Sequence, residues 1–120
     1  MRGFVMDGGE RASEVIRLHG NCPGLKLEEL KIRGFKQYGI VVSNCAGAFD
    51  RPVNLLRLRF VGDEKQVRDA AIRFQYVKNI VDPPQNRYIK VQAIKIEGGV
   101  KERYSISDPA SNDNTVDLEQ

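Results

Sequence analysis

Basic side chains recur along this chain at strand-like spacing, and the chemistry that they offer is electrostatic. In a strand, alternate residues point to the same side, so residues between core aliphatics are predicted to face outward. Because stacked strands lie about 4.8 Å apart, like charges in one column repel each other and favour a negatively charged partner. Two outward columns are predicted, and five of their eight members are basic: Val5, Lys31, Arg57 and Lys95, with Asp7, Arg33, Arg59 and Glu97 beside them.

These columns predict a flat strip that binds a linear polyanion, most simply an acidic polysaccharide. Lys31, Arg57 and Lys95 are the expected contacts, with Arg33 and Arg59 assisting. Nucleic acid is not expected as a partner, because aromatic residues that could stack on bases do not alternate with these basic positions. A solvated face that binds nothing is the alternative, since surface charges and their ion pairs are common in soluble domains.

Residues suited to acid–base catalysis are few. A lyase or glycoside hydrolase acting on an acidic glycan is the alternative function, with Asp7 or Glu97 as acid or base, but each is expected to face an arginine. The two are predicted three coils apart, farther than the roughly 5 to 9.5 Å between paired glycosidase carboxylates. The single histidine, His19, lacks neighbours at ligand spacing and is predicted to lie on the surface, a general base being the alternative. We therefore predict no catalytic residue, no metal ligand and no cofactor.

Two tetrapeptides form the sharpest local repeat, Asn21-Cys22-Pro23-Gly24 and Asn44-Cys45-Ala46-Gly47. They are predicted to occupy the same turn in successive coils, where stacked asparagines cap backbone polar groups. The two cysteines would then lie about one strand spacing apart, a distance that a disulfide also tolerates. Buried thiols are favoured, because side chains on neighbouring coils point the same way, and zinc needs more ligands than two cysteines supply.

The elements that position these residues are copies of one unit, residues 27–44, which reads as two short strands with a bend at Gly34. Apolar residues alternate with period two in each strand, and glycines mark the bends. Roughly four degenerate copies are present. The first strand recurs as Leu27, Leu30 and Ile32, then Val53, Leu56 and Leu58, then Val91, Ile94 and Ile96; the second recurs as Ile16 and Leu18, Ile40 and Val42, Ile72 and Phe74, Tyr104 and Ile106.

Repeats of this length with period-two alternation predict an all-β fold, a parallel β-solenoid of about four coils in which each strand stacks on its counterpart. Residues 47–52, 63–69 and 82–88 carry turn formers and are predicted to lengthen the corners. Residues 67–81 also contain an amphipathic helical stripe. We predict a strand over residues 71–75 instead, because it keeps register with Ile40 and Ile16.

The predicted organisation is one domain of coils over residues 1–106, followed by a polar acidic tail or linker over residues 107–120. The tail has almost no apolar side chains, so we expect it to be disordered and without a role in the fold. The chain begins inside a predicted strand, which suggests an excerpt of a longer solenoid, and open solenoid ends predict self-association. No apolar run near 18 residues and no leader is found, so we expect no membrane insertion.

Residues 24–44, GLKLEELKIRGFKQYGIVVSN, resemble a run typical of the right-handed parallel β-helix, or pectin-lyase-like, superfamily, and the likeness extends over residues 3–106. The resemblance implies a right-handed parallel β-helix. Hydrolases of that superfamily carry paired aspartates and a Gly-His-Gly, which the sequence around His19 does not match. Its lyases carry clustered acidic calcium ligands near a basic catalytic residue, and no such cluster occurs here. Because the superfamily also contains phage tailspikes, surface proteins and repeats of no known activity, the resemblance implies the architecture and not a function. Together with the basic columns, the missing catalytic motifs favour a non-catalytic repeat module that serves as a scaffold or as a surface for an acidic polysaccharide.

Overall fold

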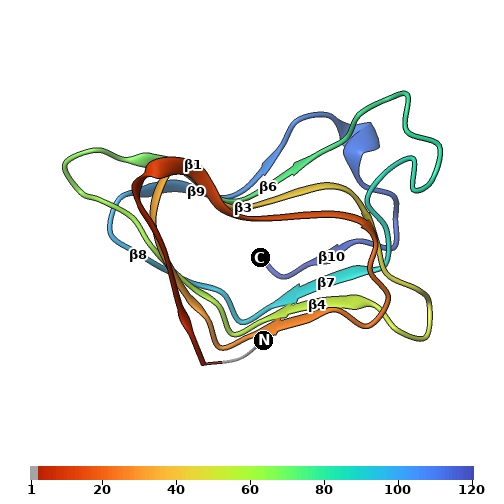
Figure 1. Ribbon diagram of the computed structural model, residues 1–120, viewed down its shortest axis with the longest axis horizontal. Coiled ribbons are helices and arrows are strands. Elements are labelled where there is room, and N and C mark those ends of the chain that lie inside the picture. Colours follow the sequence, from red (N-terminus) through yellow and green to blue (C-terminus); the bar gives the residue numbers. More distant parts are fainter. Residues whose placement is uncertain (1–2) are drawn as a thin grey trace.

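The computed structural model describes residues 3–120 and is a parallel β-solenoid of about four turns, as the repeats predict (Figure 1). Within the described chain there is no α-helix and one short 3-10 helix. The elements are β1 (Val5–Asn21), β2 (Lys26–Glu28), β3 (Lys31–Ala46), β4 (Val53–Leu56), β5 (Arg59–Val61), β6 (Arg68–Gln75), β7 (Ile89–Gln92), β8 (Lys95–Glu97), β9 (Val100–Ile106), η1 (Pro109–Ser111) and β10 (Asp117–Leu118).

Every strand pairing is parallel, and the strands form two sheets (Figure 1). One sheet has the order β10-β7-β4-β2. The other is built around β3, which pairs with β1 on one side and with both β5 and β6 on the other. Strands β8 and β9 then extend β5 and β6, so each coil crosses this second sheet in two segments with a bend between them.

Glycine produces the bend within β3. Gly34 has φ +73°, a conformation that side chains with a Cβ rarely adopt, and a Cβ there would lie 2.8 Å from the amide nitrogen of Gly9. Gly8, on the neighbouring coil, would place its own Cβ 2.6 Å from the carbonyl oxygen of Gly34. The predicted bend at Gly34 is confirmed, and its cause is the close approach of two backbones.

The register of the second strand of the repeat is also confirmed. Ile40 pairs with Ile16 on one side and with Ile72 on the other, and Ile72 pairs with Tyr104. Residues 71–75 lie in β6, so the strand prediction holds and the helical alternative is wrong.

The register predicted for the first strand is wrong by two residues. Leu27 pairs with Leu55 and Ile32 with Phe60, so Leu58 rather than Leu56 follows Leu30 in the stack. A slip of two residues keeps every side chain on its own face, so period-two alternation fits both registers. The observed register buries Phe60 completely and leaves Leu56 only half-buried.

Residues 107–120 take part in the fold, contrary to the expectation of a disordered tail. Strand β10 pairs with β7, and Leu118 lies opposite Val91. Ser111 in η1 is fully buried, and the Tyr104 hydroxyl donates to the carbonyl oxygen of Glu119 at 2.5 Å. The composition was misleading because two apolar side chains, Val116 and Leu118, pack against the core and hydrogen bonds from polar side chains hold the rest of this segment. Across residues 3–120 no helix has the length and apolarity of a membrane span.

Candidate polyanion-binding strip

One corner of the solenoid is built from residues with left-handed backbone. Glu29, Arg57 and Ala93 have φ of 56°, 52° and 56°, and each lies between a strand of one sheet and a strand of the other. The corner is stacked, since the amide of Glu29 donates to the carbonyl oxygen of Leu56 and that of Arg57 to Gln92, both at 3.0 Å. Because the backbone bonds are made along the stack, the side chains at this corner are left for the surface.

The basic column next to this corner differs from the predicted one in a single member. Val5, Lys31, Arg59 and Lys95 lie on consecutive rungs, so Arg59 takes the place predicted for Arg57. The two-residue slip has the same effect on the second column, where Val61 stands between Arg33 and Glu97. Arg57 remains beside the basic column, at the left-handed corner.

Most of the arginines of the strip are already paired with carboxylates. Arg33 donates to Asp7 at 2.9 Å, and Arg59 donates to both oxygens of Glu97 at 2.8 and 3.1 Å. Both ion pairs were expected, although Arg59 reaches Glu97 from the neighbouring column. The backbone N–H of Gly9, followed by the Arg33 side chain, lowers the pKa of Asp7.

Arg57 and the two lysines complete the electrostatics of the strip. Arg57 pairs with Glu28 and, at 3.2 Å, with Glu29. Lys31 and Lys95 form no ion pair with any residue in the range 3–120. The column therefore holds two lysine ammonium groups on either side of a paired arginine.

Two hollows flank the basic column and meet at Arg57 and Arg59. One has a volume of about 330 Å³ and is also lined by Phe4, Leu30 and Lys31. The other has a volume of about 360 Å³ and is completed by Leu58, Ala93 and Lys95. Together they form a shallow path along the stacking direction, with the exposed side chains of Phe4 and Ala93 beside a basic rim.

The candidate acid–base residues are not arranged for catalysis. Asp7 and Glu97 occupy the first and last rungs of one column, three rungs or about 14 Å apart, and each is paired with an arginine. His19 is exposed, as predicted. No group of three potential metal ligands occurs in the described part of the chain.

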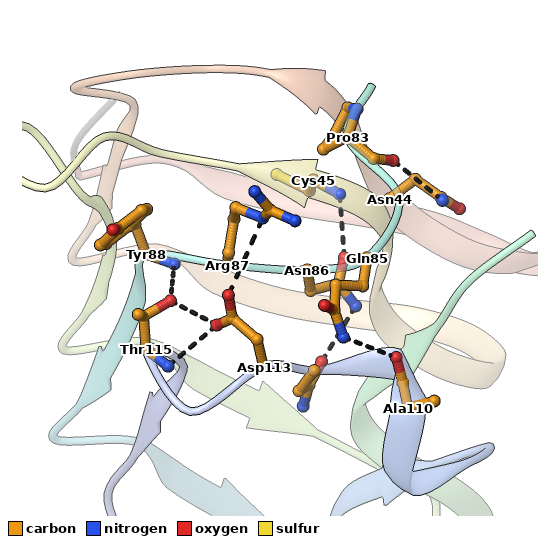
Figure 2. A network of polar contacts seen from close by, with 11 residues as sticks. Asn44, Cys45, Pro83, Gln85, Asn86, Arg87, Tyr88, Ala110, Asp113 and Thr115 are labelled. Carbon is orange, nitrogen blue, oxygen red and sulfur yellow. Dashed lines mark hydrogen bonds and ion pairs between the residues drawn. The ribbon is translucent and has the colours of Figure 1, made fainter. Parts of the chain in front are cut away.

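The opposite corner is largely buried and contains the Arg87–Asp113 ion pair (Figure 2). The sequence predicted its register wrongly. Gly20 pairs with Cys45 and Asn21 with Ala46, so Asn21 and Asn44 do not stack. The Asn21 amide instead donates to Asp82 at 3.3 Å. The two tetrapeptides match in sequence but lie two residues out of step, because β1 has register shifts near Gly20.

The amide ladder at this corner lies one coil later, at Asn86 and Asn112. Asn86 is fully buried; its Oδ1 accepts from the amide of Cys45 at 2.9 Å and its Nδ2 donates to Asn112 at 3.0 Å. The same Nδ2 lies within hydrogen-bond distance of the carbonyl oxygens of Val42 and Gln75. Asparagines 26 residues apart, each within a turn-rich segment, are the signal that could have revealed this ladder.

Asn44 fixes the excursion, the loop between Val77 and Pro83, which precedes Asn86 in the chain. Its Oδ1 accepts from the amide of Val77 at 2.7 Å, and its Nδ2 donates to the carbonyl oxygens of Val77 and Pro83 at 3.2 and 3.1 Å. One buried side chain therefore ties both ends of the excursion to the coil beneath it. Figure 2 shows the bond from Asn44 to Pro83.

Both cysteines are free thiols, as favoured from the sequence. Cys45 is buried, whereas Cys22 is partly exposed and its S–H donates to the carbonyl oxygen of His19 at 3.4 Å. Burial, with a smaller contribution from the neighbouring Cys22, raises the pKa of Cys45 to about 12. Cys45 is thus a protonated, packed side chain of the buried corner.

Comparison of the chain with protein-family models, with curated proteins and with solved structures finds no match.

Proposed function

We propose that this chain is a non-catalytic β-helix repeat module, a scaffold whose surface binds an acidic polysaccharide. The observation that supports the proposal is the run of Lys31, Arg59 and Lys95 on consecutive rungs, flanked by two hollows that meet at Arg57 and Arg59. The likeness of residues 24–44 to right-handed, pectin-lyase-like β-helices agrees with the parallel coils, and we propose that relationship as well.

Charge spacing is the first argument for a linear ligand. Consecutive rungs are about 4.8 Å apart, so the column offers positive charges at a short, regular interval along the stacking direction. Lys31 and Lys95 have no intramolecular ion pair among the described residues, and they bind an anion without breaking one. Arg59 must share its guanidinium with Glu97 and therefore contributes less than its charge suggests.

Exposed apolar side chains beside the basic column favour a polysaccharide over other polyanions. Ala93 is exposed in one hollow and Phe4 in the other. The C–H faces of sugar rings pack on such surfaces, while the acidic substituents reach the basic rim. A polyphosphate offers only the charged half of this contact.

Binding of polygalacturonate and of a sulfated glycan to the 120-residue chain, measured by calorimetry at low and at physiological salt, tests the proposal. Both contacts are expected to weaken as salt rises, because the Debye length falls to about 8 Å at 0.15 M. Removing both lysines, Lys31→Ala with Lys95→Ala, should reduce affinity about tenfold, which corresponds to about 1.4 kcal/mol. Arg59→Glu should reduce it at least as much, since it also leaves Glu97 beside a new carboxylate.

Lys36→Ala is the matched control, because Lys36 is an exposed lysine of the same strand as Lys31 but lies beyond the Gly34 bend. It should leave affinity unchanged within about twofold. Equal losses from Lys36→Ala and from the double variant would mean attraction by net charge alone. A wild-type chain that binds neither glycan at low salt would show that the strip is only a solvated face.

A further inference from the structure

The two ends of the solenoid are stepped in complementary ways (Figure 1). The sheet that contains β3 starts with β1, whereas the other sheet starts half a coil later with β2. At the opposite end the first sheet stops at β8 and β9, and the second continues for another half coil as β10. The N-terminal end therefore projects β1 beyond β2, and the C-terminal end projects β10 beyond β8 and β9. The projecting strand of each end matches the recess of the other end.

The inward columns that run through the chain begin and end with apolar residues. Ile16 and Tyr104 are the two ends of one column, and Leu18 and Ile106 are the ends of the next. Ile106 is 48% exposed, although Phe74, the residue before it in the column, is fully buried. Met6 and Ile96, and Leu27 and Leu118, end two further columns in the same way.

We propose that a second copy of this chain binds end to end, with β10 of one copy against β2 of the next and β8 and β9 against β1. The joint continues each column in register, so every terminal apolar residue meets another apolar residue. It also pairs the strand edges, whose N–H and C=O groups otherwise face water. This inference is independent of glycan binding.

Charge complementarity favours a second copy in this head-to-tail register. The column that begins at Lys26 continues through Asn54 and Lys90 to Asp117. At the joint Asp117 of one copy therefore lies opposite Lys26 of the next, whose ammonium group also pairs with Glu28 of its own chain at 3.4 Å.

Two contacts between like charges also fall at the joint. In each, at least one carboxylate is already paired with an arginine of its own chain. Glu97 would lie opposite Asp7, but these carboxylates are held by Arg59 and Arg33 within their chains. Glu102 would lie opposite Glu14, which Arg17 binds at 2.7 Å. The apolar columns and the Asp117–Lys26 pair therefore set the register.

The joint uses two different surfaces, so it does not close, and open stacks of many copies are expected rather than a dimer. Sedimentation velocity of the 120-residue chain over a range of concentrations should show species that grow beyond the dimer. Lys26→Asp puts two carboxylates at the joint, and Asp117→Lys puts two ammonium groups there. Each variant alone should weaken association about tenfold or more, while circular dichroism stays unchanged.

Mixing the two variants gives the decisive result. Each variant alone opposes like charges, but in the mixture every joint pairs a carboxylate with an ammonium group, so alternating stacks should form. Lys78→Asp, a charge reversal at an exposed position of the excursion between β6 and β7, should associate like the wild type. A monomer at all concentrations, a closed dimer, or failure of the mixture to associate more than either variant would overturn the proposal.

Discussion

The two corners of each coil satisfy the hydrogen bonds of their backbones in different ways. At the left-handed corner, Glu29, Arg57 and Ala93 adopt an unfavourable φ; the backbone amides of Glu29 and Arg57 bond along the stack, and the two side chains pair with each other at the surface. At the amide corner, the Asn86 side chain satisfies buried backbone groups and also donates to the Asn112 side chain.

The difference indicates which corner of this fold can bind a ligand. A corner whose backbone satisfies itself leaves its side chains to the solvent, and here those side chains border two hollows. A corner that consumes its side chains in internal hydrogen bonds stabilises the fold and offers no group to a ligand. Substitutions should therefore separate stability from binding according to the corner in which they lie.

Asn86→Ala should have the largest effect on stability. It removes the acceptor of the buried Cys45 amide and the donor of several other polar groups, and each buried group left unpaired costs about 1–3 kcal/mol. We expect the free energy of unfolding to fall by about 4 kcal/mol in urea titrations. Asn79→Ala, at an exposed position, should change it by less than about 0.5 kcal/mol. Equal effects of the two variants would remove the distinction between the corners.

Leu58→Ala tests the register of the left-handed corner. Leu58 is fully buried just after Arg57, so its truncation should cost about 2–5 kcal/mol. Leu56→Ala, just before Arg57, should cost less than half as much because Leu56 is only half-buried. The reverse order in thermal and urea unfolding would restore the register predicted from the sequence.

The pH dependence of stability should identify Cys45 as part of the buried corner. Its pKa rises from 9.0 to about 12 on folding, so the folded state holds a proton that the unfolded state loses. Its contribution is complete below about pH 9 and is lost as the pH rises toward 12, with a slope of at most about 1.4 kcal/mol per pH unit. Cys45→Ala should flatten this alkaline slope, whereas Cys22→Ala should leave it in place. Identical slopes in all three proteins would show that Cys45 titrates normally.

Substitutions of Arg57 should have the smallest effect on stability. The Arg57 side chain is half-exposed, and its buried partner Glu28 keeps a second pair with Lys26, so Arg57→Ala should cost only about 0.5–1 kcal/mol. Arg57→Gly should cost less, because glycine adopts φ 52° without strain. A larger loss for glycine than for alanine, measured by urea unfolding, would mean that the left-handed backbone is not the determining feature of this corner.

Much of the fold was predictable because apolar residues alternate with polar ones wherever one face of a strand is buried. The stack of Ile16, Ile40, Ile72 and Tyr104 is placed correctly, since only one register brings these residues together. The neighbouring stack was misplaced because leucines at 55, 56 and 58 satisfy two registers that differ by two residues. The burial of Phe60 favours the observed register, and this burial depends on the shape of the corner.

The ambiguity between the two registers also affects the candidate site. Lys31 and Lys95 were placed in one column correctly, because only the strand between them differs between the two alignments, and that slip exchanged Arg59 and Arg57. The order of residues 107–120 could not be predicted, because only Val116 and Leu118 pack on the core and the rest depends on hydrogen bonds such as that between Asn86 and Asn112.

The three hydrogen bonds of Asn44 make the excursion between Val77 and Pro83 a closed loop on a rigid base. The entropy of closing a loop grows slowly with its length, by about 0.6 kcal/mol for each doubling. A foreign peptide inserted beside Asn79 would therefore leave the coils intact, with its two ends anchored through one buried amide. The molecule thus has a graft site for epitopes on the corner opposite its basic strip.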